Sequence, residues 1–167
     1  MLLRLLVDTL VVAGLALLCL GYLAYERGLD DERRQIEDLR TNVRLIEQQV
    51  KLQAALGHAQ CNEDGFPVTV NPAWFGTAIP RNPMLNDGRH PWVEVAFGPE
   101  LTAEHPHLLV ASRPELAGFW YNPRTGTVRA RVPQMVSDEH TLEVYNYVNG
   151  CNLSKLFVHD LEPVTAD

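Results

Sequence analysis

The sequence predicts an α+β protein in which an N-terminal transmembrane helix continues into a coiled-coil-like helix, followed by a small antiparallel sheet domain with a C-terminal helix. Three observations lead to this prediction. Residues 5–25 form a nearly uncharged apolar run, the polar stretch after them carries a periodic apolar stripe, and short alternating segments follow from residue 92 onward. The expected divisions are a transmembrane anchor at 1–25, an amphipathic helix at 26–57, a small globular domain at 58–161 and a loose tail at 162–167.

The apolar run at residues 5–25 carries one charged residue, Asp8. About 20 apolar residues in a helix span a bilayer, and Tyr22 and Tyr25 lie at one end of the run, where interfacial aromatics are typical. A cleaved signal peptide is the alternative, but its apolar region is usually shorter and ends at a small-residue cleavage site. We therefore expect a single-pass protein of the cell membrane with an extracytoplasmic C-terminal domain, while the arginines after the run leave the opposite orientation open.

Six apolar residues recur beyond the anchor at spacings of 7, 3, 4, 3 and 4. They are Leu29, Ile36, Leu39, Val43, Ile46 and Val50. This a/d stripe is typical of a helix that pairs with another helix, although the same stripe also suits packing on the chain's own domain. We expect Gly57 to end the helix. The pattern predicts a homo-oligomer, or a pairing with another single-pass envelope protein.

Short strands are predicted further along the chain. Residues 61–91 are rich in Pro, Asn and Gly, which indicates an irregular connection with one short strand near residues 66–70. The alternating run at 92–97 and the more apolar run at 107–112 predict two more strands.

A C-terminal helix is predicted after residue 136. Ser137 or Asp138 can cap its start, and Gly150 can stop it. Alternation of apolar residues in the same stretch leaves a strand as the alternative.

The stretch "GFWYNPRTGTVRARVP", residues 118–133, predicts a β-hairpin with one buried face. Asn122 can accept a local hydrogen bond, Pro123 fixes φ for the turn, and Gly126 can take a left-handed conformation. Phe119 and Tyr121 would then face the core.

The opposite face of this hairpin would present Trp120, Arg129 and Arg131. An arginine over the indole would form a cation–π pair. This face is a possible contact surface, and plain decoration of a solvated sheet is the alternative.

Three cysteines are present, and Cys61 and Cys151 bracket the predicted globular domain. In an exported domain they can pair as a disulfide, whereas in the cytosol they would remain free thiols.

No catalytic or metal motif stands out. The spacing around His105 and His107 matches no recognised metal pattern, and the sequence contains no nucleophile elbow and no glycine-rich phosphate loop. The net charge of −7 argues against a nucleic-acid partner. We expect a protein without cofactor or metal that is not an enzyme.

The helix at 5–56 followed by the motif "WYNPRTGTV" at 120–128 resembles the type IV pilins and the type II secretion pseudopilins. The resemblance implies assembly through the N-terminal helix, with Asp8 at the place of the acidic residue that meets a neighbouring subunit's N-terminal amine. The sequence departs from the family at the processing site, where Leu3 precedes Arg4 and no glycine is near.

These features predict a non-enzymatic, pilin-like membrane protein with an exported domain that acts through helix-mediated assembly. Two alternatives stay open. One is a bitopic coiled-coil scaffold subunit of a secretion or division complex. The other is a membrane-tethered ligand-binding module.

Overall fold

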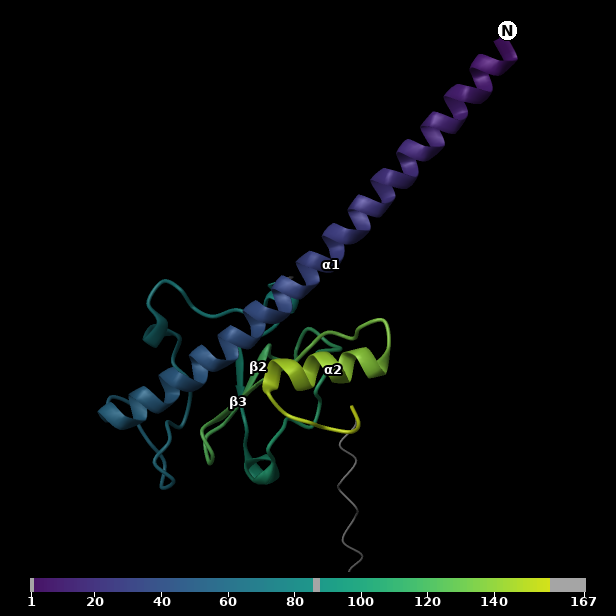
Figure 1. Cartoon of the computed structure of the whole chain (residues 1–167). Coiled ribbons are helices and arrows are strands. Elements are labelled where there is room, and N and C mark those ends of the chain that lie inside the picture. The colour runs from purple at the N-terminus through teal and green to yellow at the C-terminus, as the bar shows by residue number, and fades with distance from the viewer. Residues whose placement is uncertain (1, 86–87, 157–167) are drawn as a thin grey trace, which may run out of the picture. The chain divides into compact units, whose positions relative to one another are not determined.

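This computed structural model describes the backbone of residues 2–85 and 88–156, with side chains from Ala13 onward (Figure 1). Its two main helices are α1 (Leu2–Leu56) and α2 (Asp138–Asn149), and its strands are β1 (Val93–Val95), β2 (Phe119–Asn122) and β3 (Thr127–Ala130). Short 3₁₀ helices lie in the connections: η1 (Pro72–Phe75), η2 (Pro83–Leu85) and η3 (Gly98–Thr102). The chain divides into two compact units, Met1–Gln35 and Ile36–Asp167.

The first unit is a single stretch of helix α1. It contains no proline, and its described N-terminal part is rich in leucine and alanine, which favour helix. Further along, Arg33 and Arg34 approach Asp30 and Asp31 at 3.7 and 3.8 Å. These pairs are exposed, so each adds only a few tenths of a kcal/mol, roughly, to helix stability.

No helix in the described part of the chain combines the length and the apolar content that crossing a membrane requires. This finding contradicts the predicted transmembrane anchor at 1–25 and the predicted single-pass location in a cell membrane. The side chain of Asp8 lies outside the described residues.

The second unit is built on a three-stranded sheet in the order β1-β2-β3. Strand β1 runs parallel to β2, whereas β2 and β3 are antiparallel. The prediction of an antiparallel sheet is therefore correct for the hairpin and wrong for β1. The reason is the connection: a tight turn joins antiparallel neighbours, but the long segment 96–118 crosses back and allows a parallel pairing.

One face of the sheet is covered by the C-terminal part of α1 and by α2 (Figure 1). The helix residues in this core are Leu39, Val43, Ile46 and Val50 of α1 with Val144, Tyr145 and Val148 of α2. They pack with Phe119, Tyr121, Val128 and Ala130 of the sheet. Ile36 is partly buried beside them, whereas Leu29 belongs to the first unit and is exposed. Most of the predicted helix-pairing stripe therefore serves the chain's own core, which is the intramolecular one of the two alternatives.

Two predicted strands are absent from the described residues. The stretch at 66–70 contributes only an isolated bridge between Cys61 and Pro67, and the stretch at 107–112 only a bridge between Val110 and Val132. Phe66, Val70 and Leu109 from these stretches pack in or against the core without extended pairing. Burial alone was thus enough to explain their sequence pattern.

Helix α2 confirms the prediction of a C-terminal helix. The Ser137 hydroxyl accepts a hydrogen bond from the His140 N–H at 3.1 Å, which caps the first turn. Gly150 takes a left-handed conformation with φ of 61° at the other end. Gly57, with φ of 65°, ends α1 in the same way.

The neighbouring residues Ile46 and Leu45 allow a direct test of the core. Ile46 is fully buried, whereas Leu45 is 41% exposed on the same helix. We expect Ile46→Ala to lower the free energy of unfolding by about 2–5 kcal/mol because it leaves a cavity. We expect Leu45→Ala to change it by about 0.5 kcal/mol or less. Urea unfolding of both variants checks this, and equal effects would contradict the described packing.

Candidate functional site

The second face of the sheet carries the residues that were predicted to form a contact surface. Glu94, Trp120 and Arg129 are neighbours across the three strands. Trp120 is fully buried and Arg131 is 2% exposed. The prediction that Trp120, Arg129 and Arg131 form an outer surface is therefore wrong. The reason is that the long segment between β1 and β2 lies over this face.

Side chains of the sheet hold this covering segment by its backbone carbonyls. The buried amide of Asn122 donates to the carbonyls of Leu101 and Ala103 at 3.1 and 2.9 Å. Arg129 Nε donates to the carbonyl of Glu104 at 3.3 Å. A segment with little regular structure has many carbonyls to satisfy, and these side chains replace the missing strand partners.

Arg131 makes the most extensive set of these contacts. Its Nε and Nη1 atoms donate to the carbonyls of Leu108 and Ala117 at 2.9 and 3.0 Å. Its Nη2 atom lies 2.7 Å from Glu94 Oε2. The guanidinium thus joins strand β1, the end of β3 and two points of the covering segment, which makes it a structural group.

The turn between β2 and β3 has the predicted geometry. Asn122 Oδ1 accepts the Arg124 N–H at 2.9 Å, and Gly126 has φ of 69°. Asn62 reaches the turn from a distant loop and donates to the Pro123 carbonyl at 2.7 Å. The hairpin at 118–133 is therefore tied to a distant loop at its turn, while Arg124 and Thr125 remain exposed. Sequence reasoning missed the double role of Asn122, which only the covering segment reveals.

All three cysteines are free thiols in this structure, so the possible Cys61–Cys151 disulfide is not formed. The thiols of Cys61 and Cys151 each have a local acceptor instead. Cys61 Sγ donates to the Ala59 carbonyl at 3.5 Å, and Cys151 Sγ donates to Asn146 Oδ1 at 3.3 Å. Burial raises the pKa of the Cys151 thiol, which favours its protonated form.

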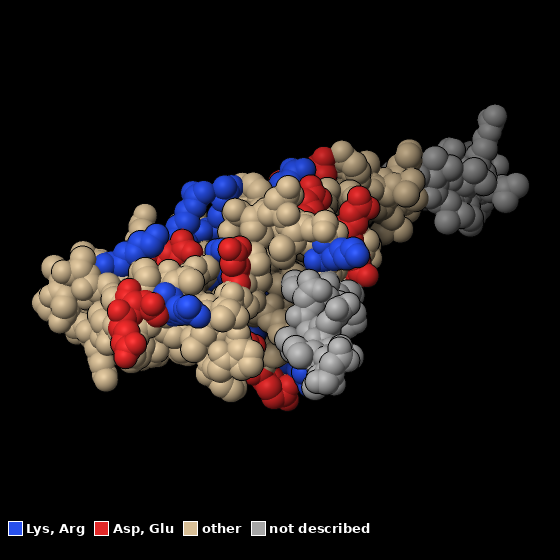
Figure 2. All heavy atoms as spheres, turned by 90° about the horizontal axis from the view of Figure 1, so that it is seen from below, with Lys and Arg blue, Asp and Glu red and all other residues tan. Residues whose placement is uncertain are grey.

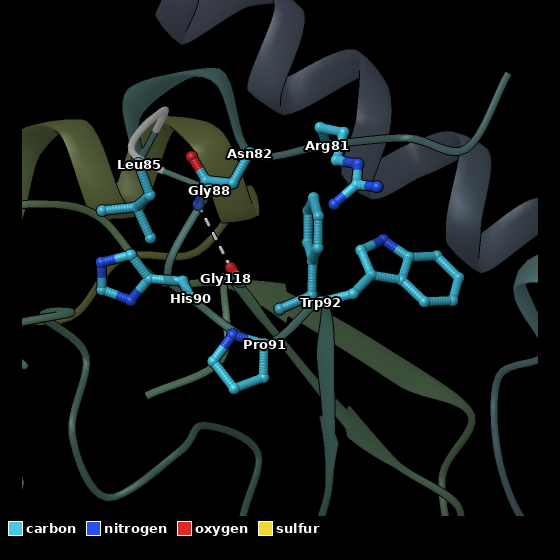
Figure 3. A pocket seen from close by; sticks show the side chains of 9 residues that line it. Arg81, Asn82, Leu85, Gly88, His90, Pro91, Trp92 and Gly118 are labelled. Carbon is cyan, nitrogen blue, oxygen red and sulfur yellow. Dashed lines mark hydrogen bonds between the residues drawn. The ribbon is translucent and has the colours of Figure 1, made fainter. Parts of the chain in front are cut away.

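A cavity of about 310 Å³ opens beside the start of β1 (Figure 3). It lies between segments 81–85, 88–92 and 118–119. Its volume is at the lower end of the range for small-molecule sites, roughly 300–1,000 Å³. No sequence pattern singled it out, because its residues come from three separate segments, two of them irregular.

Three polar side chains of this cavity are fixed by backbone carbonyls. Asn82 donates to Gly118 and Arg131 at 3.2 and 2.8 Å. Trp92 Nε1 donates to Pro80 at 2.7 Å. His90 Nδ1 lies 2.8 Å from the Leu116 carbonyl, which identifies this nitrogen as the protonated one. The cavity wall is therefore held in place by its own hydrogen bonds.

The first unit offers a second candidate site. Five leucines of α1 between Ala13 and Tyr25 are exposed, each by about half or more of its surface. They are Leu15, Leu17, Leu18, Leu20 and Leu23. Large exposed apolar areas of this kind mark interaction sites.

His105 contacts helix α2 from the covering segment. Its Nδ1 lies 3.1 Å from the Tyr145 hydroxyl. Burial lowers the pKa of His105, the nearby Arg129 lowers it further, and Glu104 acts in the opposite direction. Burial raises the pKa of Tyr145, so its hydroxyl remains protonated at neutral pH.

No protein-family model, curated protein or solved structure matches this chain.

Arg131 provides a test of how the covering segment is held. We expect Arg131→Met to lower the free energy of unfolding by about 3 kcal/mol, the lower end for a broken buried pair, since Glu94 stays in contact with water. Arg113→Met, at an exposed arginine of the same segment, should change it by about 0.5 kcal/mol or less. Urea unfolding of the two variants measures this. A near-neutral Arg131→Met would show that the carbonyl contacts contribute little.

His105 predicts a pH dependence of stability. Its pKa is lowered on folding from the ordinary value of about 6.5, so the unfolded chain binds more protons below that pH. The free energy of unfolding should therefore fall as the pH drops from about 6.5 toward the lower folded pKa. In His105→Gln this part of the pH dependence should disappear. Identical pH profiles of the two proteins would contradict the assignment.

Proposed function

We propose that this protein is a non-enzymatic assembly subunit with a pilin-like layout, which associates with copies of itself through the N-terminal part of helix α1. The observation that carries the proposal is the ring of exposed leucines between Ala13 and Tyr25. Adjacent residues of a helix point about 100° apart, so Leu17 and Leu18 with Leu15 and Leu20 present apolar surface on several sides. A helix that is apolar on several sides is normally buried in a larger core.

A second copy is the occupant that fits this surface best. Its own leucines offer the same apolar area, and burying them together removes both surfaces from water. Polar partners gain little here, because the described stretch from Ala13 to Tyr25 contains no charged side chain. Several such helices side by side would form a bundle with a shared apolar core.

The organisation of the second unit supports this division of roles. The part of α1 that lies in it already buries Leu39, Val43, Ile46 and Val50 in its own core. This apolar stripe is therefore occupied. Self-association is left to the exposed leucines of the first unit.

The resemblance to pilins and pseudopilins supports the same function. Those families join a long N-terminal helix to a small sheet domain. The chain shares this order, with α1 followed by a hairpin whose turn is built from Asn122–Gly126. The family assembles through its helices, which is the role proposed for this segment.

The absence of a catalytic role is part of the proposal. Asn122 and Arg131, both buried on the second sheet face, use their side chains to hold backbone carbonyls. On the surface, acidic and basic side chains lie interspersed over the face in Figure 2. This mixture, with a net charge of −7, does not favour a polyanionic partner.

Leu18 and Leu52 form a matched pair for testing the proposal, because both are exposed leucines of α1, at 72% and 48%. We expect the full chain to form concentration-dependent oligomers in sedimentation velocity. Leu18→Asp should shift it to monomers, since a charge would be buried in the apolar bundle. Leu52→Asp should leave the oligomers unchanged.

Two results would reject self-assembly. One is a wild-type chain that stays monomeric at every concentration, which would favour a scaffold that binds a different protein. The other is an equal effect of both substitutions. Circular dichroism of each variant shows whether the helix is retained.

A further inference from the structure

We propose that the cavity beside β1 binds a small organic carboxylate with a flat apolar body, such as an arylacetate. This inference is independent of self-assembly, because every residue of the cavity lies in the second unit. It rests on the shape of the cavity, on its apolar walls and on one arginine.

The walls of the cavity are mainly apolar. Trp92, Leu85 and Pro91 line it (Figure 3). Since the indole N–H of Trp92 is already bonded to the Pro80 carbonyl, the ring offers apolar surface to the cavity. Phe119 also borders the cavity, but it is fully buried in the core and offers no exposed surface to a ligand. Such walls suit the flat body of an aromatic ligand.

One cation completes the lining. Arg81 is exposed, and no acidic side chain among the described residues forms an ion pair with it. Its backbone is held, however, because its carbonyl accepts a hydrogen bond from Asn42 at 2.8 Å. A guanidinium at the side of an apolar cavity matches a carboxylate, which it can bind with two parallel hydrogen bonds.

Two other polar side chains of the described lining already bond backbone groups. The amide nitrogen of Asn82 and the ring nitrogen Nδ1 of His90 are both bonded to backbone carbonyls. Among the described lining residues, Arg81 is therefore the side chain that we expect to make the specific polar contact with a ligand.

The cavity is also preorganised. A Cβ atom at Gly118 would lie 3.1 Å from the Cβ of Asn82, which is tighter than most Cβ contacts, so a side chain there would displace Asn82 by a few tenths of an ångström. The approach lets the Asn82 amide bridge Gly118 and Arg131, at 3.2 and 2.8 Å. A wall held in this way loses little entropy when a ligand binds.

Phenylacetate and phenylacetamide form a matched probe pair, equal in shape and different in charge. Each is titrated into the ¹⁵N-labelled full chain, and the indole N–H signal of Trp92 is followed by NMR. We expect saturable shifts with phenylacetate and at least tenfold weaker binding of phenylacetamide. Arg81→Gln should remove this difference, whereas Arg113→Gln, an exposed arginine outside the cavity, should keep it.

A cavity-filling variant tests whether phenylacetate binds in this cavity or elsewhere on the chain. Leu85→Trp should abolish the phenylacetate shifts while the rest of the spectrum stays that of a folded chain. The proposal is overturned if phenylacetate gives no saturable shifts, if both probes bind equally, if Arg113→Gln weakens binding as much as Arg81→Gln, or if Leu85→Trp still binds.

Discussion

Strand β2 lies at the centre of the sheet, hydrogen-bonded on both edges and buried on both faces, and the rest of the second unit is arranged to meet that requirement. Toward α1 and α2 it presents Phe119 and Tyr121, which require apolar neighbours. Toward the covering segment it presents Trp120 and Asn122, and the buried amide of Asn122 requires hydrogen-bond partners. Each face therefore selects its own kind of cover.

Polar burial explains how a segment with little regular structure can cover a sheet. A buried carbonyl without a donor costs about 1–3 kcal/mol, and the donors come from Asn122, Arg129 and Arg131. Side-chain hydrogen bonds also satisfy backbone groups at the outer edge of β3. There the Asn149 amide bonds both the N–H and the carbonyl of Ala130, at 2.8 and 3.0 Å. An edge satisfied in this way is closed to the addition of another strand.

The two proposals follow from what this arrangement leaves uncovered. The core uses the apolar stripe of α1 from Leu39 to Val50, whereas the described leucines before Tyr25 remain exposed. In the second unit, the Asn82 bridge closes one side of a cavity whose arginine has no acidic partner among the described residues. Assembly and ligand binding would thus use separate parts of the chain.

The sequence by itself determined the local elements. Helix period and caps identified α1 beyond residue 28 and α2 with Ser137 and Gly150 at its ends, and turn chemistry identified the hairpin at Asn122–Gly126. These features depend on neighbouring residues, so they are readable without a fold. The alternation of β2 and β3 also gave the correct sides for Phe119 and Trp120.

Only the tertiary structure decided what covers each face of the sheet. Alternation tells which residues share a face, but it does not tell whether water or a distant segment lies against that face. For this reason Trp120 and Arg131 were expected at a surface and are buried, and the stripe from Leu39 to Val50 had two possible partners until the sheet supplied one. The parallel pairing of β1 and the cavity at Arg81 depend in the same way on contacts between residues far apart in the chain.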